Sequence, residues 1–337
     1  MNLIIPENCN PVLTTRETEA AIKLVKDYFE RALSCMLNLT RVSAPIMVSP
    51  DSGLNDNLNG VERPVSFDVL ETGEHAEIVH SLAKWKRLAL KNYGFKPGEG
   101  LYTDMNAIRR DEDELDNLHS VYVDQWDWEK VILNENRNLD YLKLTVMDIV
   151  TAICDTQDTM QAIYPQLQPL GKLERRVSFV TAQQLEDSYP GLSPKARENA
   201  YLRGHHTAFI IGIGGALSSG RPHDGRAPDY DDWRLNGDIM VWNELLGCAF
   251  ELSSMGIRVD PEALDRQLRI SGCDGRRSLP YHRALLNGEL PLTIGGGIGQ
   301  SRLSMLLLGK AHIGEVQASV WDEATASLCE QAGIMLL

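Results

Sequence analysis

Apolar positions near the start of the chain recur at helical spacing. In "TTRETEAAIKLVKDYFERALSCML" they fall three or four residues apart, which places them on one face of a helix. Thr14 stands three residues before Glu17, which is the spacing of a capping box at a helix start. The pattern predicts a long amphipathic helix at about residues 15–38. Its apolar face is predicted to carry Ile22, Val25, Phe29, Leu33 and Met36.

Period-two alternation predicts strands further along the chain. In "LHSVYVDQWDWEK" alternate residues point to opposite faces, so Gln125 and Asp127 lie on the same face. In "LNGDIMVWNELLGCAFELSSMGIRVD" two strands flank a short connection, and a hairpin would bring Asp238 and Glu251 side by side. The β-branched residues of "NLTRVSAPIMVS" also predict a strand, with Pro45 at its edge or end.

Charged side chains occupy the ends of these predicted elements. Two carboxylates on separate strands suit a Mg²⁺ ion whose remaining coordination positions are filled by phosphate oxygens and water. The simpler interpretation of such a pair is that both acids face solvent. Arg109 precedes an acidic loop, Arg258 follows the strand that holds Glu251, and Arg302 opens the last apolar helix. Guanidinium groups match carboxylate or phosphate oxygens two at a time, so several arginines at strand or helix ends suit an anion site. A surface ion pair is the simpler interpretation of each arginine taken alone.

The stretch "GGGIGQSRLSMLLL" at residues 295–308 places glycines before a helix, where backbone N–H groups often bind phosphate. The known phosphate motifs do not fit. A dinucleotide fingerprint counted from Gly295 requires glycine where Gln300 stands, and the pair Gly309-Lys310 is followed by alanine instead of the Ser or Thr of a P-loop.

Composition narrows the class of protein. The chain has 337 residues, 43% hydrophobic and 24% charged, and lacks repeats and low-complexity linkers, which predicts one continuous globular domain over 1–337. No apolar run approaches the ~20 residues of a membrane span, and "MNLIIPENCN" lacks the pattern of a signal peptide, so we expect a cytoplasmic protein without a membrane partner. A net charge of −14 argues against nucleic-acid binding. Six cysteines without metal-ligand spacing indicate neither a zinc site nor a disulfide framework.

Seven separated motifs occur together and in a family's order. They are "VHSLAKWKR", "GEGLYT", "HSVYVDQWDWE", "RAPDYDDW", "LNGDI", "FELSSMGIRVD" and "IGGGIGQSRL". The chain resembles the ammonia-dependent asparagine synthetases, or aspartate–ammonia ligases, of the class II aminoacyl-tRNA synthetase-like superfamily. This resemblance covers essentially the whole chain. It implies an α+β fold, with an antiparallel sheet of about six to eight strands flanked by helices.

By this resemblance, Arg302 is similar to the motif 3 arginine that contacts ATP phosphate, and the preceding glycines keep side chains away from the adenine. Arg109 is similar to the motif 2 arginine that holds the α-phosphate and the substrate. Asp238 and Glu251 look like the acids that bind ATP and Mg²⁺. Asp56 matches an acidic position near the reacting β-carboxyl group, where it is hypothesised to hold ammonia and accept a proton. The positions expected around the amino acid are Lys86, Gln125, Asp127, Asp231 and Arg258.

The implied reaction is the ATP-dependent synthesis of L-asparagine from L-aspartate and ammonia through β-aspartyl-AMP. Free ammonia is the expected nitrogen source, because Asn2 stands where a glutaminase would carry its cysteine. A homodimer is expected in this superfamily, with the helix at 15–38 and the strand around Pro45 contributing buried surface. Two alternatives remain: an aspartyl- or asparaginyl-tRNA synthetase paralogue without an anticodon-binding domain, and a non-catalytic sensor of asparagine or nucleotide.

Some residues receive plainer predictions. The His205-His206 pair is expected to lie on the surface, and Lys84 and Arg87 are expected to be solvated next to Lys86. The chain also departs from the family at Arg234, which alone joins "DYDDW" to "LNGD" where a longer connection is usual. Contacts from that region to the ATP site are therefore in doubt.

Overall fold

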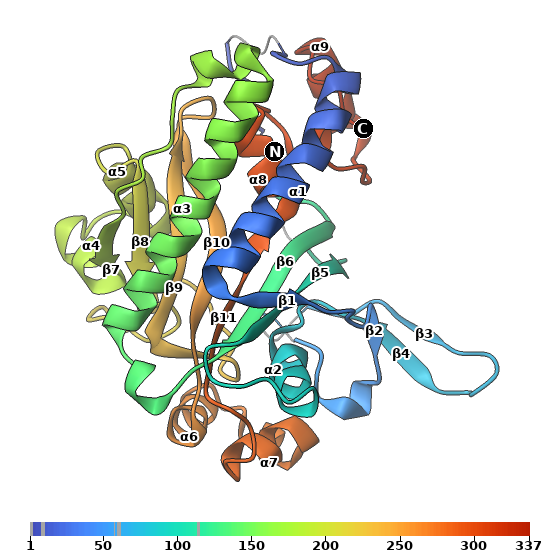
Figure 1. The fold of residues 1–337 in the computed structure, drawn as a ribbon, viewed down its shortest axis with the longest axis vertical. Coiled ribbons are helices and arrows are strands. Elements are labelled where there is room, and N and C mark those ends of the chain that lie inside the picture. The colour runs from blue at the N-terminus through green and yellow to red at the C-terminus, as the bar shows by residue number, and fades with distance from the viewer. Residues whose placement is uncertain (1–2, 8–10, 57, 59–61, 113–114) are drawn as a thin grey trace.

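The computed structural model describes residues 3–7, 11–56, 58, 62–112 and 115–337. Asn2 and Cys9 lie outside the described residues. A large sheet forms the centre of the molecule (Figure 1). In spatial order its strands are β1 (Leu39–Arg41), β5 (Gly100–Ile108), β6 (Tyr122–Val131), β11 (Thr293–Gly299), β10 (Cys248–Arg258), β9 (Asp231–Asn243), β8 (Thr207–Ile211) and β7 (Ser178–Thr181).

The sheet confirms the predicted fold class, with one difference at its edges. Its central strands pair antiparallel, whereas β1 pairs parallel with β5 and β7 pairs parallel with β8. The described strands of this sheet number eight, the upper end of the predicted range. A mainly parallel sheet, which would have pointed to a dinucleotide site, is not what the chain forms.

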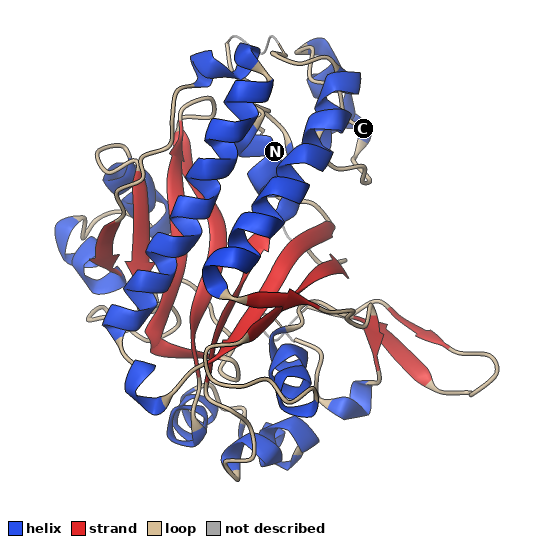
Figure 2. Ribbon diagram, in the orientation of Figure 1, coloured by secondary structure: helices blue, strands red, loops and turns tan. Residues whose placement is uncertain are grey.

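Helices surround the sheet (Figure 2). Two long helices, α1 (Thr15–Leu37) and α3 (Leu139–Ile163), lie side by side across one face. The shorter helices lie around the sheet. They are α2 (Ala83–Asn92), α4 (Ala182–Ser188), α5 (Pro194–Leu202), α6 (Pro261–Ile270), α7 (Pro280–Leu286), α8 (Gln300–Leu307) and α9 (Glu323–Gln331). One of them, α8, packs against α1.

The first helix confirms the periodicity analysis. Thr14 caps α1, its side chain accepting a hydrogen bond from the backbone of Glu17 while the Glu17 carboxylate reaches back to Thr14. Val25, Phe29 and Leu33 are buried as predicted. Met36 was wrongly placed on the buried face. Met36 is exposed and Leu37, one position on, is buried, because the helical face drifts by a residue near the end of α1.

The region around Pro45 forms two strands instead of one. "NLTRVSAPIMVS" contributes β1 to the large sheet and β2 (Met47–Val48) to a small sheet, with Pro45 in the segment between them. The small sheet pairs β2 and β3 (Ser66–Asp68) with β4 (His75–Ile78) and forms an arm that projects from the body (Figure 1). Proline lacks a backbone N–H, so Pro45 suits this segment, which belongs to neither strand.

The main core lies between the sheet and the long helices. It includes Leu13 near the start and Ile334 near the end of the chain, so the two ends of the sequence share one buried cluster. Phe29 of α1 packs on Trp126 of β6, with ring centroids 4.7 Å apart. Because side chains alternate along a strand, Gln125 and Asp127 of β6 point away from α1, toward the opposite face.

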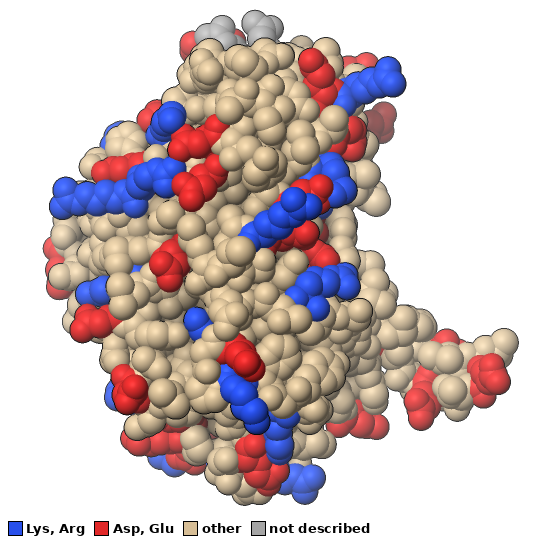
Figure 3. All heavy atoms as spheres, viewed as in Figure 1, with Lys and Arg blue, Asp and Glu red and all other residues tan. Residues whose placement is uncertain are grey.

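Two surface features bear on the sequence predictions. His205 and His206 are exposed, as expected. On the face shown in Figure 3, basic and acidic side chains are interspersed. No described helix is both long and apolar enough to cross a membrane.

Candidate active site

A cleft with a volume of about 360 Å³ opens on the face of the sheet opposite α1 and α3. Its floor comes from β6, β10 and β11, and its walls come from loops and from the start of α8. Eight of the residues predicted to form the site line this cleft. They are Asp56, Arg109, Gln125, Asp127, Asp231, Glu251, Arg258 and Arg302. The other two, Lys86 and Asp238, each contact a lining residue.

The acidic pair lies on the predicted hairpin of β9 and β10. Asp238 stands directly opposite Ser254, and the Ser254 hydroxyl lies 2.7 Å from an Asp238 carboxylate oxygen and 3.1 Å from one of Glu251. Leu252 has no partner in β9, so it forms a β-bulge between Glu251 and Ser253. Without this extra residue Glu251 would point to the other face of the sheet.

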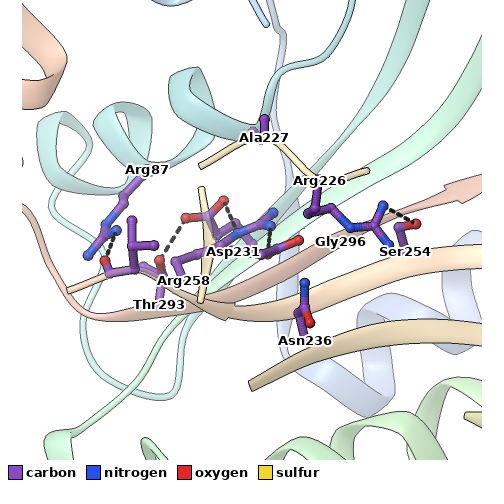
Figure 4. A network of polar contacts seen from close by, with 12 residues as sticks. Arg87, Arg226, Ala227, Asp231, Asn236, Ser254, Arg258, Thr293 and Gly296 are labelled. Carbon is purple, nitrogen blue, oxygen red and sulfur yellow. Dashed lines mark hydrogen bonds and ion pairs between the residues drawn. The ribbon is translucent and has the colours of Figure 1, made fainter. Parts of the chain in front are cut away.

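Two arginines meet the acidic pair. Arg226, from the loop between β8 and β9, places its guanidinium 2.6 Å from Asp238 and donates a hydrogen bond of 3.1 Å to Ser254. Arg302 of α8 lies 3.7 Å from the Glu251 carboxylate and donates to the Glu251 backbone carbonyl. Figure 4 shows Arg226 directed at Ser254. The pair is therefore flanked by positive charge on both sides.

The two acids respond differently to this environment. Burial raises the pKa of Asp238 to about 7, and the nearby negative charge of Glu251 adds to the rise while Arg226 opposes it. Burial also acts to raise the pKa of Glu251, but Arg302 and Arg226 outweigh it and hold that pKa below its ordinary value. The cleft thus concentrates more negative charge here than burial readily tolerates, which is the condition for attracting a cation.

The amino-acid side of the cleft is held by a buried ion pair. Lys86 of α2 contacts the Asp127 carboxylate and also donates to the backbone carbonyls of Trp128 and Gly296. Burial lowers the pKa of Lys86, while Asp127 acts in the opposite direction. Asp127 also accepts a hydrogen bond from the Leu82 backbone, so its carboxylate is fixed in place.

Arg258 lies deep in the floor. Its guanidinium contacts Asp231 and donates to Glu129 at 3.3 Å, and Glu129 accepts a further hydrogen bond of 2.7 Å from Thr293 (Figure 4). Burial acts against the charge on Arg258, but the acidic neighbours Asp231 and Glu129 raise its pKa above the ordinary value. The arginine is therefore a permanent positive charge in the floor.

The glycines of β11 make room for these side chains. A Cβ on Gly297 would stand 2.3 Å from the Gln125 side chain, and one on Gly295 would stand 2.8 Å from the Arg258 guanidinium. Both distances are shorter than a van der Waals contact, so no other residue fits without displacing the floor. The glycine run thus seats Gln125 and Arg258 in the cleft.

Asp56 occupies a buried corner. It is 3% exposed, and burial raises its pKa above the ordinary value while Lys84 opposes the rise. Behind it, Asp229 accepts hydrogen bonds from Arg276 at 2.8 Å and from His282 at 3.0 Å, and Lys84 lies 3.8 Å away. Asp56 is therefore the acid in this corner whose pKa is raised, whereas the pKa of Asp229 is lowered.

The prediction that Lys84 and Arg87 are solvated is wrong. Both are buried. The Lys84 ammonium faces Asp229, and Arg87 donates to the carbonyls of Val259 and Pro291. Both belong to α2, which packs against β5, β6 and β11. Their charged groups therefore find partners inside the fold instead of solvent.

Arg109 follows the end of β5, where the sequence placed it, and its backbone N–H pairs with Val121. Its guanidinium enters the cleft near Asp56, and its Nε is buried without a hydrogen-bond partner in the described structure. A buried donor that faces a cleft is ready for an anionic ligand.

Sequence reasoning missed three residues that build the site. Arg226 stands in the motif "RAPDYDDW" but received no role, although its arginine was visible. Glu129 stands two residues after Asp127 on the same strand, so the alternation that places Gln125 and Asp127 on one face also predicts that Glu129 lies there. Ser254 carried no sequence signal, because its place beside the acids depends on strand pairing. The departure at Arg234 falls within a bulge of β9, and the strand passes through without a break.

The comparisons with known proteins agree with one another. The family described as aspartate-ammonia ligase matches residues 16–333. A relative named aspartate–ammonia ligase from Ruminiclostridium cellulolyticum is 59% identical, covering 100% of this chain and 99% of its own length. One of the same name from Lactobacillus acidophilus is 58% identical over the whole of both chains.

Solved structures support the fold independently. Asparaginyl-tRNA synthetase from Pyrococcus horikoshii, complexed with asparaginyl-adenylate, has a TM-score of 0.67 at 16% identity, covering 89% of this chain and 68% of the other. Asparaginyl-tRNA synthetase from Entamoeba histolytica has a TM-score of 0.65 at 15% identity, covering 90% and 67%. At these identities the likeness establishes the class II synthetase fold alone, whereas the family match and its relatives extend over nearly the full length. The chain therefore belongs to the aspartate–ammonia ligase family.

Proposed function

We propose that this protein catalyses the ATP-dependent amidation of L-aspartate by ammonia. The β-carboxylate attacks the α-phosphorus of ATP, which gives β-aspartyl-AMP and pyrophosphate, and ammonia then displaces AMP to give asparagine. The observation that supports this most directly is that one cleft combines four arginines with an acidic pair and a separate buried carboxylate. Family membership supports the same reaction.

The arginines serve the first half-reaction. Arg109 and Arg302 enter the cleft from the end of β5 and from the first turn of α8, where they can meet phosphate oxygens from two sides. Charge builds up on these oxygens in the transition state, so fixed guanidinium groups stabilise it more than the ground state. Arg258 in the floor, beside Gln125, suits a carboxylate of the amino acid.

Asp238 and Glu251 fit Mg²⁺ by their chemistry. They offer hard carboxylate oxygens from two paired strands, and the guanidinium groups that lie against them support a site for positive charge. They would hold the ion together with phosphate oxygens. When bound, the ion supplies positive charge to the phosphates during displacement.

Asp56 serves the second half-reaction. Ammonium has no lone pair, so a proton must leave before the nitrogen can attack. The raised pKa of Asp56 suits a proton acceptor, because a carboxylate with a higher pKa binds a proton more tightly. Asp56 lines the same cleft, so it can accept a proton from ammonium that enters there.

A direct assay tests the reaction. Purified protein is incubated with aspartate, ATP and Mg²⁺ and with ammonia, glutamine or tRNA as the acceptor, and AMP and asparagine are measured. We expect both products in equal amount with ammonia. Formation of AMP without asparagine, or charging of tRNA instead, would reject the proposal.

The remaining features stay predictions. We propose that residues 1–337 form one catalytic domain in the cytoplasm and that the protein neither binds nucleic acid nor inserts into a membrane. A homodimer is supported by apolar side chains left exposed on α1 and in the region around Pro45, namely Tyr28, Met36, Ile46 and Met47. Burying such a surface favours association. Sedimentation at micromolar protein should give twice the chain mass, and a stable monomer would contradict it.

A further inference from the structure

Arg226 holds an unusual place beside the acidic pair. Its guanidinium spans Asp238 and Ser254, at 2.6 Å and 3.1 Å, and its side chain is only 12% exposed. Gly214, in the same loop, makes this position accessible, since a Cβ there would stand 2.8 Å from the Arg226 side chain. The chain thus places a positive charge where the proposed function places Mg²⁺.

We propose that Arg226 is an internal counterion that occupies the cation position between Asp238 and Glu251 until the metal arrives with its nucleotide, and that it then moves onto the phosphates. This inference rests on the proposed function. Mg²⁺ and a guanidinium held at the same Asp238 carboxylate repel each other, because both are positively charged. If Mg²⁺ binds alone, the displaced Arg226 guanidinium is left in the open cleft without an anionic partner. If Mg²⁺ binds together with ATP, the phosphate oxygens become the new partners of Arg226.

The surroundings of Arg226 support such an exchange. It lines the cleft, so the phosphates are within its reach, and its loop is anchored on the far side by hydrogen bonds from Ser219 to Glu186 and between His223 and Glu198. The base of the loop is thereby fixed while the side chain carries the movement. Among the described residues the buried Arg226 Nε has no hydrogen-bond partner, so one N–H of this side chain is free to donate to a ligand.

The proposal predicts that divalent cations bind poorly until nucleotide is present, and that removing Arg226 removes this dependence. Mn²⁺ replaces Mg²⁺ as the probe, because its binding can be followed by electron paramagnetic resonance without any turnover. In the absence of nucleotide, Arg226→Gln should bind Mn²⁺ roughly tenfold or more tightly than the unaltered protein, since the competing charge is gone. With a non-hydrolysable ATP analogue, the unaltered protein should bind Mn²⁺ well.

Matched variants isolate the charge. Arg226→Lys keeps a positive charge and should still exclude Mn²⁺, whereas Arg234→Gln removes an exposed arginine of β9 and should leave Mn²⁺ binding unchanged. Adding Asp238→Asn to Arg226→Gln should abolish the gain. Thermal unfolding checks that each variant is folded.

Two results separate the ways of failing. Equal nucleotide-free Mn²⁺ affinity for Arg226→Gln and the unaltered protein would overturn the counterion proposal and leave asparagine synthesis standing. Absence of Mn²⁺ binding to the unaltered protein even with the ATP analogue would overturn the metal site, and with it both the counterion and that part of the proposed function.

Discussion

Charged side chains in the cleft have partners inside the protein before any substrate binds. Among the ion pairs that hold them are Lys86 with Asp127, Arg258 with Asp231, and Arg226 with Asp238. A pair of this kind keeps its groups in one geometry, but it also makes each partner costly to remove, because the other charge is left buried. Substitutions here therefore change stability as well as binding.

Asp127→Asn tests this at one pair. The change keeps the shape of the side chain but leaves the Lys86 ammonium without its carboxylate, and we expect a loss of about 3 kcal/mol in the free energy of unfolding, measured with urea. Aspartate binding should weaken by about 1.5–3 kcal/mol if the carboxylate also meets the substrate ammonium, while ATP binding changes little. Adding Lys86→Met should recover part of the stability. Unaltered stability and unaltered aspartate affinity would remove Asp127 from both roles.

Arg109→Ala and Arg302→Ala address the phosphate chemistry. Each should lower the rate of adenylate formation by roughly 10² or more, because a fixed charge partner of the transition state is lost. Pyrophosphate release in a single turnover measures that step. Arg110→Ala is the control, since Arg110 is exposed next to Arg109 and does not line the cleft. Near-normal release by either cleft variant would show that its arginine is not catalytic.

At the scale of elements, α8 connects the core to the cleft. Asp124 of β6 accepts a hydrogen bond of 3.0 Å from the Ser301 backbone in the first turn of α8, and its other oxygen meets Lys26 of α1 at 3.2 Å. A carboxylate at this position satisfies a free N–H and matches the positive end of the helix dipole. Because Arg302 follows directly, Asp124 sets the direction in which that arginine points.

Asp124→Ala should therefore destabilise the protein by about 1 kcal/mol, the usual cost of losing a helix cap, and raise KM for ATP more than it lowers kcat. Asp124→Asn should restore most of the ATP affinity, because its amide oxygen still accepts from Ser301. Lys26→Met serves as the control, since a partly exposed ion pair contributes less than about 1 kcal/mol. If Asp124→Ala lowers stability while KM for ATP is unchanged, Asp124 has no part in positioning Arg302.

At the scale of the whole molecule, the core is closed by the C-terminal segment. His312 is fully buried, its Nδ1 accepts a hydrogen bond from the Gly314 backbone, and its ring packs edge-on against Trp321. Because Nδ1 accepts, the neutral ring carries its proton on Nε2. Burial lowers the pKa of His312 to about 4, and Asp116 offsets only part of this effect.

The lowered pKa predicts a pH dependence of folding. The unfolded chain protonates His312 near pH 6.5, whereas the folded protein protonates it only near pH 4. The contribution of the neutral, buried His312 to stability is therefore complete above pH 6.5 and is lost as the pH falls toward 4. The total is about 3 kcal/mol. The free energy of unfolding, measured with urea, is compared between the unaltered protein and His312→Asn. The advantage of the unaltered protein over the variant should be about 3 kcal/mol smaller at pH 4 than at pH 7. Parallel curves across this range would contradict it.

Local periodicity determined much of this protein. The capped helix α1, the alternation that aims Gln125 and Asp127 at one face, and the hairpin of β9 and β10 all follow from spacings of two to four residues. Such patterns can be read from the sequence because each helix or strand must bury one of its faces, whichever element it packs against. The motif resemblance added the family and the residues to be sought in one cleft.

Tertiary structure decided the rest. The bulge at Leu252 turns Glu251 toward Asp238, and a bulge depends on how two strands pair, which their separate sequences do not record. The burial of Lys84 and Arg87 depends on carbonyls and carboxylates from distant segments that satisfy them. Arg226 reaches the acidic pair only because its loop folds back over β9 and β10. Periodicity along the chain shows which side of an element is buried, but long-range packing chooses the partner of each buried charge.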